Sequence, residues 1–192
     1  MVSGFRSARK DQGESVNRRS IRLKDYDYLS EGMYFVTICT QDRQHVFGEI
    51  ADGVMGLNNA GQMIQESWKQ LPERFDTVKL DEFIVMPNHV HGIIAIVGAP
   101  FMAPNDHDGI ANKGAINRAP TLGEIIRTFK AVSTRQIHLS GLNEFKWQRN
   151  YYEHVIRNEN ELFKTRQYVQ ENPIKWELDP ENVAMEGKEV LS

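Results

Sequence analysis

The chain has 192 residues, of which 40% are hydrophobic and 26% are charged, and its formal net charge is −3. These values fit one soluble globular domain with a single core, and no apolar run approaches the roughly 20 residues needed to cross a membrane. The single cysteine, Cys39, excludes an internal disulfide and a cysteine-based zinc site. Because the N-terminal region also lacks the apolar core of a secretory signal, we expect a cytoplasmic protein.

Side-chain periodicity and turn residues divide the chain into short elements. In chain order the predicted elements are a strand over 33–40, a hairpin over 48–58, a helix over 58–71, strands over 78–86 and 89–97, a long loop over 98–120, a helix over 122–139, a strand over 145–156 and a helix over 158–173. Thr121 can cap the second long helix, and Pro72 and Pro173 mark helix ends.

The order of these elements predicts the fold. A short connection through Pro87 and Asn88 makes the strands over 78–86 and 89–97 an antiparallel pair. A βαββαβ order of this kind is typical of the split βαβ arrangement. We therefore predict an α+β, ferredoxin-like antiparallel sheet with helices packed on it, followed by a C-terminal helix that carries Tyr168.

The charges are unevenly distributed along the chain. The region before Leu29 is rich in Arg and Lys, whereas the region after Pro173 is acidic. We predict a flexible basic arm over 1–17, one folded domain over 18–176 and a flexible acidic tail over 177–192. A basic arm is compatible with phosphate contacts, although a solvated terminus has the same composition.

Two histidines are candidates for a metal site. His89 and His91 lie one residue apart at the start of a predicted strand, so their side chains point to the same face, roughly 7 Å apart at Cα. Imidazole is the commonest neutral metal ligand. The same pattern also fits one histidine that is hydrogen bonded to a loop beside one that is exposed, so the pair alone leaves both interpretations open.

The last predicted helix carries residues that complement this pair. Tyr168 and Asn172 are four positions apart and therefore share a helix face. The amide oxygen of Asn172 could complete a site for a hard cation, and Tyr168 could attack a phosphate held there. Packing of Tyr168 with Leu162 and Val169 in an amphipathic helix is the alternative. No P-loop or GxGxxG motif is present, so nucleotide-driven chemistry is not indicated.

Taken together, MPNHVHGII, WQRNYYEHVIRN and YVQENP resemble the single-tyrosine HUH transposases, the insertion-sequence-two-hundred-like enzymes and their REP-associated relatives, in which HUH denotes His-hydrophobic-His. The resemblance extends from Arg18 to Trp176. It implies that His89 and His91 bind Mg²⁺ or Mn²⁺ and that Asn172 stands where the family places its third ligand.

The resemblance also implies a nucleophile, a substrate and an assembly. Tyr168 would cut single-stranded, hairpin-forming DNA, form a 5′-phosphotyrosine link and release a 3′-hydroxyl. Tyr151 and Tyr152 are rival nucleophiles, but the alignment of YVQENP favours Tyr168. The candidate contacts to the DNA backbone are Arg18, Arg19, Arg22, Arg127, Lys130 and Arg135. Insertion-sequence members are dimers that exchange the tyrosine helix, whereas REP-associated members can be monomers, so homodimer and monomer both stay open.

Two functions from other classes compete with a DNA transposase. A domesticated protein could retain the fold and hairpin recognition but not move DNA. An unrelated metal-dependent phosphodiesterase on a ferredoxin-like fold would use water and would not need Tyr168. The presence of His89, His91 and Tyr168 together favours the transposase.

Overall fold

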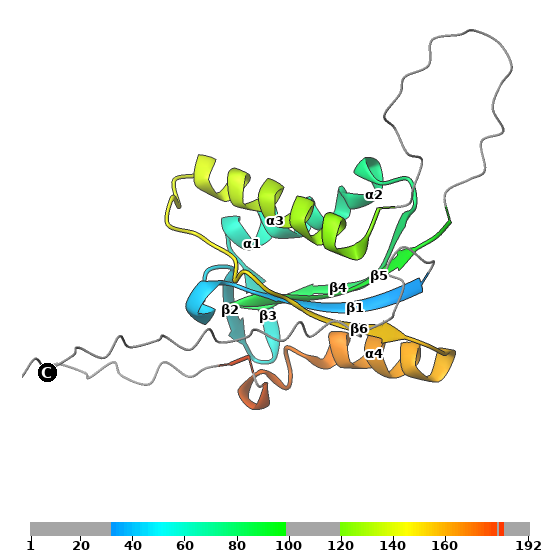
Figure 1. Cartoon of the computed structure of the whole chain (residues 1–192). Coiled ribbons are helices and arrows are strands. Elements are labelled where there is room, and N and C mark those ends of the chain that lie inside the picture. Colours follow the sequence, from blue (N-terminus) through cyan, green and yellow to red (C-terminus); the bar gives the residue numbers. More distant parts are fainter. Residues whose placement is uncertain (1–31, 99–119, 180, 183–192) are drawn as a thin grey trace, which may run out of the picture.

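The structure is a computed structural model that describes residues 32–98, 120–179, 181 and 182 (Figure 1). The predicted arm over 1–17, the arginines Arg18, Arg19 and Arg22, and most of the predicted loop lie outside the described residues.

A four-stranded antiparallel sheet forms the centre of the molecule (Figure 1). Its strands are β1 (Gly32–Cys39), β4 (Val78–Val85), β5 (His89–Ile96) and β6 (Tyr152–Ile156), in the spatial order β4-β5-β1-β6. The helices are α1 (Asn59–Lys69), α2 (Leu71–Arg74), α3 (Leu122–Leu139) and α4 (Glu159–Glu171). This strand order, with α1 and α3 as the crossovers, is the ferredoxin-like arrangement, so the predicted fold class is confirmed.

Local sequence explains where these elements begin and turn. The two-stranded sheet of β2 (Gly48–Ala51) and β3 (Val54–Leu57) turns at Asp52 and Gly53, which both have positive φ, as a tight hairpin turn requires. Thr121 and Glu124 form a reciprocal capping box at the start of α3. Pro72 follows the predicted helix as expected, but it lies in the first turn of the short α2, where its missing N–H costs nothing.

Both faces of the sheet are covered by helices, and different helices cover each face. One face packs on α1 and α3 and contains Val36, Val90 and Ile94, whereas the other packs on α4 and contains Phe35 and Ile93 (Figure 1). The packing of the sheet against α1 requires Gly92 in β5, because a Cβ atom there would lie 2.3 Å from Cζ2 of Trp68 in α1. Alternation along β5 therefore places His89 and His91 on the α4 face.

The predicted strand over 145–156 is shorter than expected. Only Tyr152–Ile156 pair regularly, and Trp147 makes one isolated bridge with Thr40. The indole of Trp147 is in the core and donates to Ser133 Oγ at 3.1 Å, which draws the chain off the sheet. The ammonium of Lys130 then binds the carbonyl oxygens of residues 148–150, so these carbonyls are not in a β-ladder.

Candidate active site

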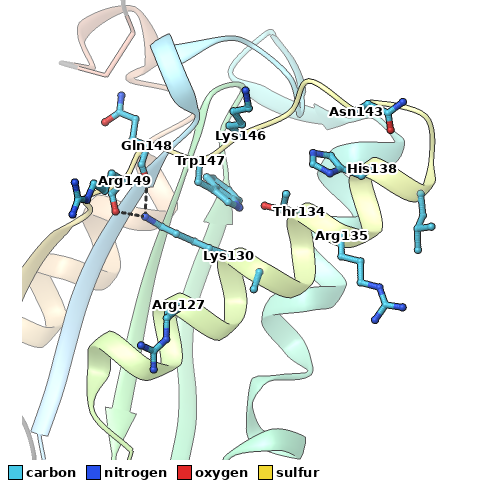
Figure 2. A pocket seen from close by; sticks show the side chains of 12 residues that line it. Arg127, Lys130, Thr134, Arg135, His138, Asn143, Lys146, Trp147, Gln148 and Arg149 are labelled. Carbon is cyan, nitrogen blue, oxygen red and sulfur yellow. Dashed lines mark hydrogen bonds between the residues drawn. The ribbon is translucent and has the colours of Figure 1, made fainter.

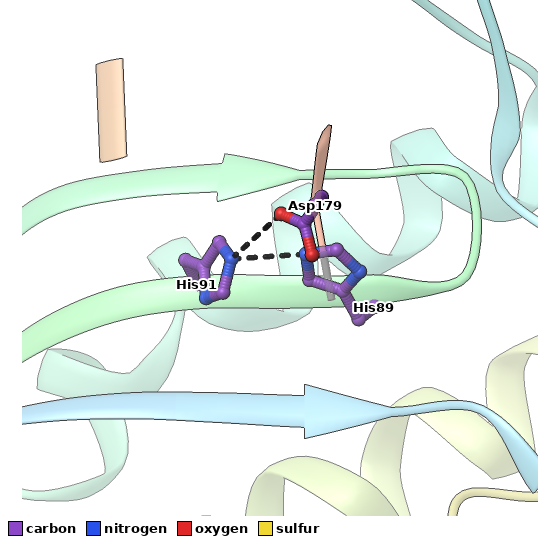
Figure 3. Close-up of side chains that lie close together, drawn as sticks. All are labelled: His89, His91 and Asp179. Carbon is purple, nitrogen blue, oxygen red and sulfur yellow. Dashed lines mark hydrogen bonds and ion pairs between the residues drawn. The ribbon is translucent and has the colours of Figure 1, made fainter. Parts of the chain in front are cut away.

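Strand β5 brings the two histidines together in the interior. His89 is 0% exposed and His91 is 1% exposed, and their Nε2 atoms face each other at 3.0 Å (Figure 3). Burial, followed by the proximity of His91, holds the pKa of His89 well below its usual value. His89 is therefore neutral at physiological pH, the form that can ligate a metal.

The outward nitrogens of both rings have partners that orient them. His89 Nδ1 lies 2.7 Å from Asn88 Oδ1, and His91 Nδ1 lies 2.9 Å from the hydroxyl of Thr37 on the neighbouring strand β1. The Asn88 amide is itself fixed, because its Nδ2 donates to the backbone carbonyls of Arg43 and Glu181. An accepting oxygen at Asn88 places the proton of His89 on Nδ1, which leaves the Nε2 lone pair directed inward.

A carboxylate completes the cluster. Asp179 lies beside the histidines, and one ligand atom from each of the three residues lies within 4.8 Å of the others (Figure 3). Burial alone would raise the pKa of the Asp179 carboxyl, but contacts with His91, the Glu181 amide and Asn172 outweigh it and lower this pKa to about 2. The carboxylate is consequently charged at physiological pH.

Sequence reasoning did not find Asp179, which falls beyond Trp176, in the segment predicted as a flexible tail. The 3-10 helix η2 (Trp176–Leu178) carries the chain to the site, and the Trp176 ring lies 5.9 Å from the ring of His89. Glu181 then fastens the segment through an ion pair of 2.9 Å with Arg43. Nothing in the local sequence separates Asp179 from the neighbouring acids, so tertiary contacts alone identify it.

Tyr168 lies at this cluster within its own chain. Its hydroxyl is 3.4 Å from His91 Nε2, and its ring packs against Phe35, with 5.8 Å between ring centroids. The residue is 41% exposed, so the tyrosine lies between the buried histidines and the protein surface. Burial, and then the charge of Asp179, raises the pKa of this phenol, which is therefore neutral at physiological pH.

Helix α4 is held against the sheet by apolar and ionic contacts. Leu162 and Val169 are buried with Ile93, and Arg166 forms a bidentate pair with Asp81 of β4 at 2.8 and 2.6 Å. The hydrogen bonds from Arg166 lower the pKa of Asp81 below its ordinary value of 3.8. These contacts fix the position of Tyr168 relative to β5.

The Asp81–Arg166 pair gives a pH-dependent prediction. Because the folded pKa of Asp81 is depressed, the pair contributes stability above about pH 4, and this contribution is lost as pH falls through the folded pKa. We expect Asp81→Asn to lower the melting temperature slightly at pH 7, and we expect the difference from the parent to vanish in acid. Thermal unfolding across a pH series measures this. A difference that persists unchanged into strong acid would contradict it.

Asn172, the predicted third ligand, is 2% exposed and contacts both Tyr168 and Asp179. Its Oδ1 is buried without a hydrogen-bond partner, and so is Oδ2 of Asp179. Two inward imidazole nitrogens, the charged Asp179 carboxylate and the Asn172 amide oxygen form a donor set that suits a divalent cation. The residues present therefore fit the predicted metal, although Asn172 itself stays a predicted ligand.

The predicted DNA contacts on α3 lie on the opposite face of the sheet. Arg127, Lys130 and Arg135 line a cavity of about 740 Å³ together with residues of the loop that follows α3 (Figure 2). Lys130 differs from the two arginines, because its Nζ already donates to the carbonyl oxygens of Gln148, Arg149 and Asn150 at 2.8, 3.4 and 3.0 Å. These bonds occupy all three donors of the ammonium, so Lys130 has a structural role here.

The rival tyrosines differ from Tyr168 in their surroundings. Tyr151 packs beneath Lys130, with 5.5 Å from the ammonium to its ring centroid, on the α3 side. Tyr152 is on β6 and is 50% exposed. The Tyr168 hydroxyl, by contrast, contacts His91 directly. The geometry therefore supports the choice of Tyr168 over both neighbours.

The chain is similar to known proteins in sequence and in fold. No family model matches the chain. An uncharacterized protein of Haemophilus influenzae is 41% identical over 170 residues, covering 85% of this chain and 92% of that protein. A second H. influenzae protein, described as a putative REP-associated tyrosine transposase, is 24% identical over 151 residues, covering 78% of this chain and 74% of its own length.

A solved structure shares the fold. It is a REP-associated tyrosine transposase bound to a REP hairpin, with a TM-score of 0.52 and 19% identity, covering 81% of this chain and 74% of that chain. The chain is therefore similar to REP-associated tyrosine transposases in sequence and in fold. The resemblance predicted from its motifs is thereby confirmed. Within the part of the chain that the structure describes, none of the helices is long and apolar enough to span a membrane.

Proposed function

We propose that the protein is a single-stranded DNA endonuclease and strand transferase that acts in DNA transposition, with Tyr168 as the nucleophile. The observation that carries this proposal is the position of the Tyr168 hydroxyl, 3.4 Å from His91 Nε2, at the edge of a buried set of metal-ligating atoms. A tyrosine packed only as part of an amphipathic helix would not need its hydroxyl there.

The reaction is a transesterification. The phenol oxygen of Tyr168 forms a bond to phosphorus, and the bond between phosphorus and the 3′-oxygen breaks. The phenol proton leaves Tyr168, and a proton is taken up by the departing 3′-oxygen, which becomes a 3′-hydroxyl. Because the number of phosphoester bonds is unchanged, rejoining the strand to another 3′-hydroxyl requires no nucleotide triphosphate. This agrees with a sequence that has no P-loop.

The residues that would hold a divalent cation are His89, His91 and Asp179, with the Asn172 amide oxygen as a further donor. Mg²⁺ or Mn²⁺ bound there supplies neutralisation of charge on the scissile phosphate and on Asp179. Thr37 and Asn88 orient the two imidazoles from outside, and α4 fixes the phenol for in-line attack.

We propose that the basic cavity on α3 contacts the phosphates of a DNA hairpin stem. The structural neighbour is bound to such a hairpin. Arg127, Arg135, Lys146 and Arg149 line the cavity, and no acidic residue is among its described lining residues. Cationic side chains without acidic partners supply the sequence-independent part of DNA binding.

The cavity gives a prediction on salt dependence. Replacing Arg127 and Arg135 with alanine should weaken hairpin binding and flatten the slope of log affinity against log salt concentration by about one for each phosphate that the protein no longer neutralises. Fluorescence anisotropy over a salt series measures both effects. Lys79→Ala removes an exposed cation on β4 and serves as the matched control. An unchanged slope in the double variant would place the stem elsewhere.

The proposal itself is tested by incubating the full chain with single-stranded DNA that carries a hairpin, in the presence of Mn²⁺. We expect a protein–DNA adduct that survives denaturation, and we expect chelation to suppress it. Cleavage without any adduct would favour a phosphodiesterase that uses water. Hairpin binding without cleavage would favour a domesticated binding protein.

A further inference from the structure

A second tyrosine lies on the same face of the sheet as the candidate active site. In the antiparallel register, Thr37 of β1 pairs with His91 of β5 on one side and with Tyr152 of β6 on the other. Residues that pair directly across strands point to the same face. His91, Thr37 and Tyr152 therefore form one row across the sheet, on the face that α4 covers.

Tyr152 is supported on one side and open on the other. Its ring packs edge-on against the buried ring of Phe35, with 6.3 Å between ring centroids. Phe35 also packs against Tyr168, with 5.8 Å between ring centroids. Tyr152 is 50% exposed, because β6 is an edge strand of the sheet. A rigidly supported, half-exposed ring beside the nucleophile is thus available for stacking.

We propose that Tyr152 is a positioning residue that stacks against a base of the single strand whose phosphate is presented to Tyr168. This inference rests on the proposed function, because it takes single-stranded DNA as the substrate. Unpaired bases expose their faces, and stacking on an aromatic side chain accepts any base. The rings of Tyr152 and Tyr168 both pack on Phe35, with centroid distances of 6.3 and 5.8 Å. One DNA strand can therefore contact both tyrosines.

The test uses the full chain with Tyr168→Phe, which keeps the ring at 168 but cannot form an adduct. The probes are single-stranded oligonucleotides with 2-aminopurine at successive positions, because this base loses fluorescence when an aromatic ring stacks on it. We expect quenching at one position. Adding Tyr152→Leu should abolish that quenching and weaken binding between about fivefold and a hundredfold, whereas Tyr152→Phe should retain both.

The outcomes separate this inference from the proposed function. Quenching that depends on Tyr152 supports stacking even if the parent protein forms no adduct. Adduct formation by the parent, together with quenching and affinity that are unchanged in Tyr152→Leu, overturns stacking while leaving the nucleophile intact. Failure of the Tyr168→Phe protein to bind or quench any probe also overturns it. Thermal unfolding of Tyr152→Leu checks that the sheet is intact.

Discussion

Replacing Tyr168 with phenylalanine should reduce the covalent protein–DNA adduct by at least about a thousandfold while leaving hairpin affinity unchanged. The change removes only the phenol oxygen, which is the atom that forms the new bond to phosphorus. The ring still packs on Phe35, and α4 keeps its contacts with β4 through Arg166. Disappearance of the adduct would therefore report a defect in the chemistry and not in the fold. Gel analysis of radiolabelled DNA after denaturation measures the adduct.

Matched controls come from the rival tyrosines. Tyr151→Phe and Tyr152→Phe remove the same atom from neighbouring residues, and both should leave the adduct yield close to that of the parent. An unchanged yield in Tyr168→Phe would defeat the assignment of the nucleophile. Cleavage that continues in this variant without any adduct would indicate attack by water.

Replacing His91 with alanine should largely abolish divalent-ion binding, because His91 contributes an inward imidazole nitrogen to the predicted site. Isothermal titration with Mn²⁺ measures the affinity directly, independently of DNA cleavage. Thr37→Val is the control, because it removes only the hydroxyl that orients His91 and leaves both imidazoles in place. We expect it to weaken Mn²⁺ binding by about ten- to a hundredfold. Mn²⁺ affinity that is unchanged in His91→Ala would place the metal elsewhere.

The same titration identifies the third ligand. If Asp179 is a ligand, Asp179→Asn should weaken Mn²⁺ binding more than Asn172→Ala does, because a carboxylate contributes charge that an amide oxygen lacks. The reverse order would assign the third position to Asn172, as the sequence resemblance implies. Thermal unfolding of each variant excludes loss of the fold as the reason.

Local rules account for most of what the sequence predicted. Hydrophobic periodicity and capping residues placed the helices, with Thr121 and Asn158 as the observed caps. Strand alternation correctly predicted that His89 and His91 share one face of β5, and helical spacing predicted that Tyr168 and Asn172 share one face of the last helix. Because the ferredoxin-like order leaves α4 to cover the face opposite α1 and α3, these two pairs meet.

The features that sequence reasoning missed depend on contacts between distant segments. Asp179 reaches the histidines because Asn88 and Arg43 hold Glu181, and none of these contacts leaves a periodic signal. The ammonium of Lys130 looks like a solvated charge on α3, yet it satisfies three backbone carbonyls of a segment that was predicted as strand. Trp147 is not part of a regular strand, and its indole packs in the core against Phe47, Phe129 and Phe145.

Mass spectrometry of the digested adduct tests the central claim most directly. The full chain is incubated with hairpin-bearing single-stranded DNA and Mn²⁺, and the adduct is then treated with protease and nuclease. We expect a nucleotide on the peptide that contains Tyr168, attached to its side chain. Attachment to Tyr151 or Tyr152, or cleaved DNA with no modified peptide, would contradict the account.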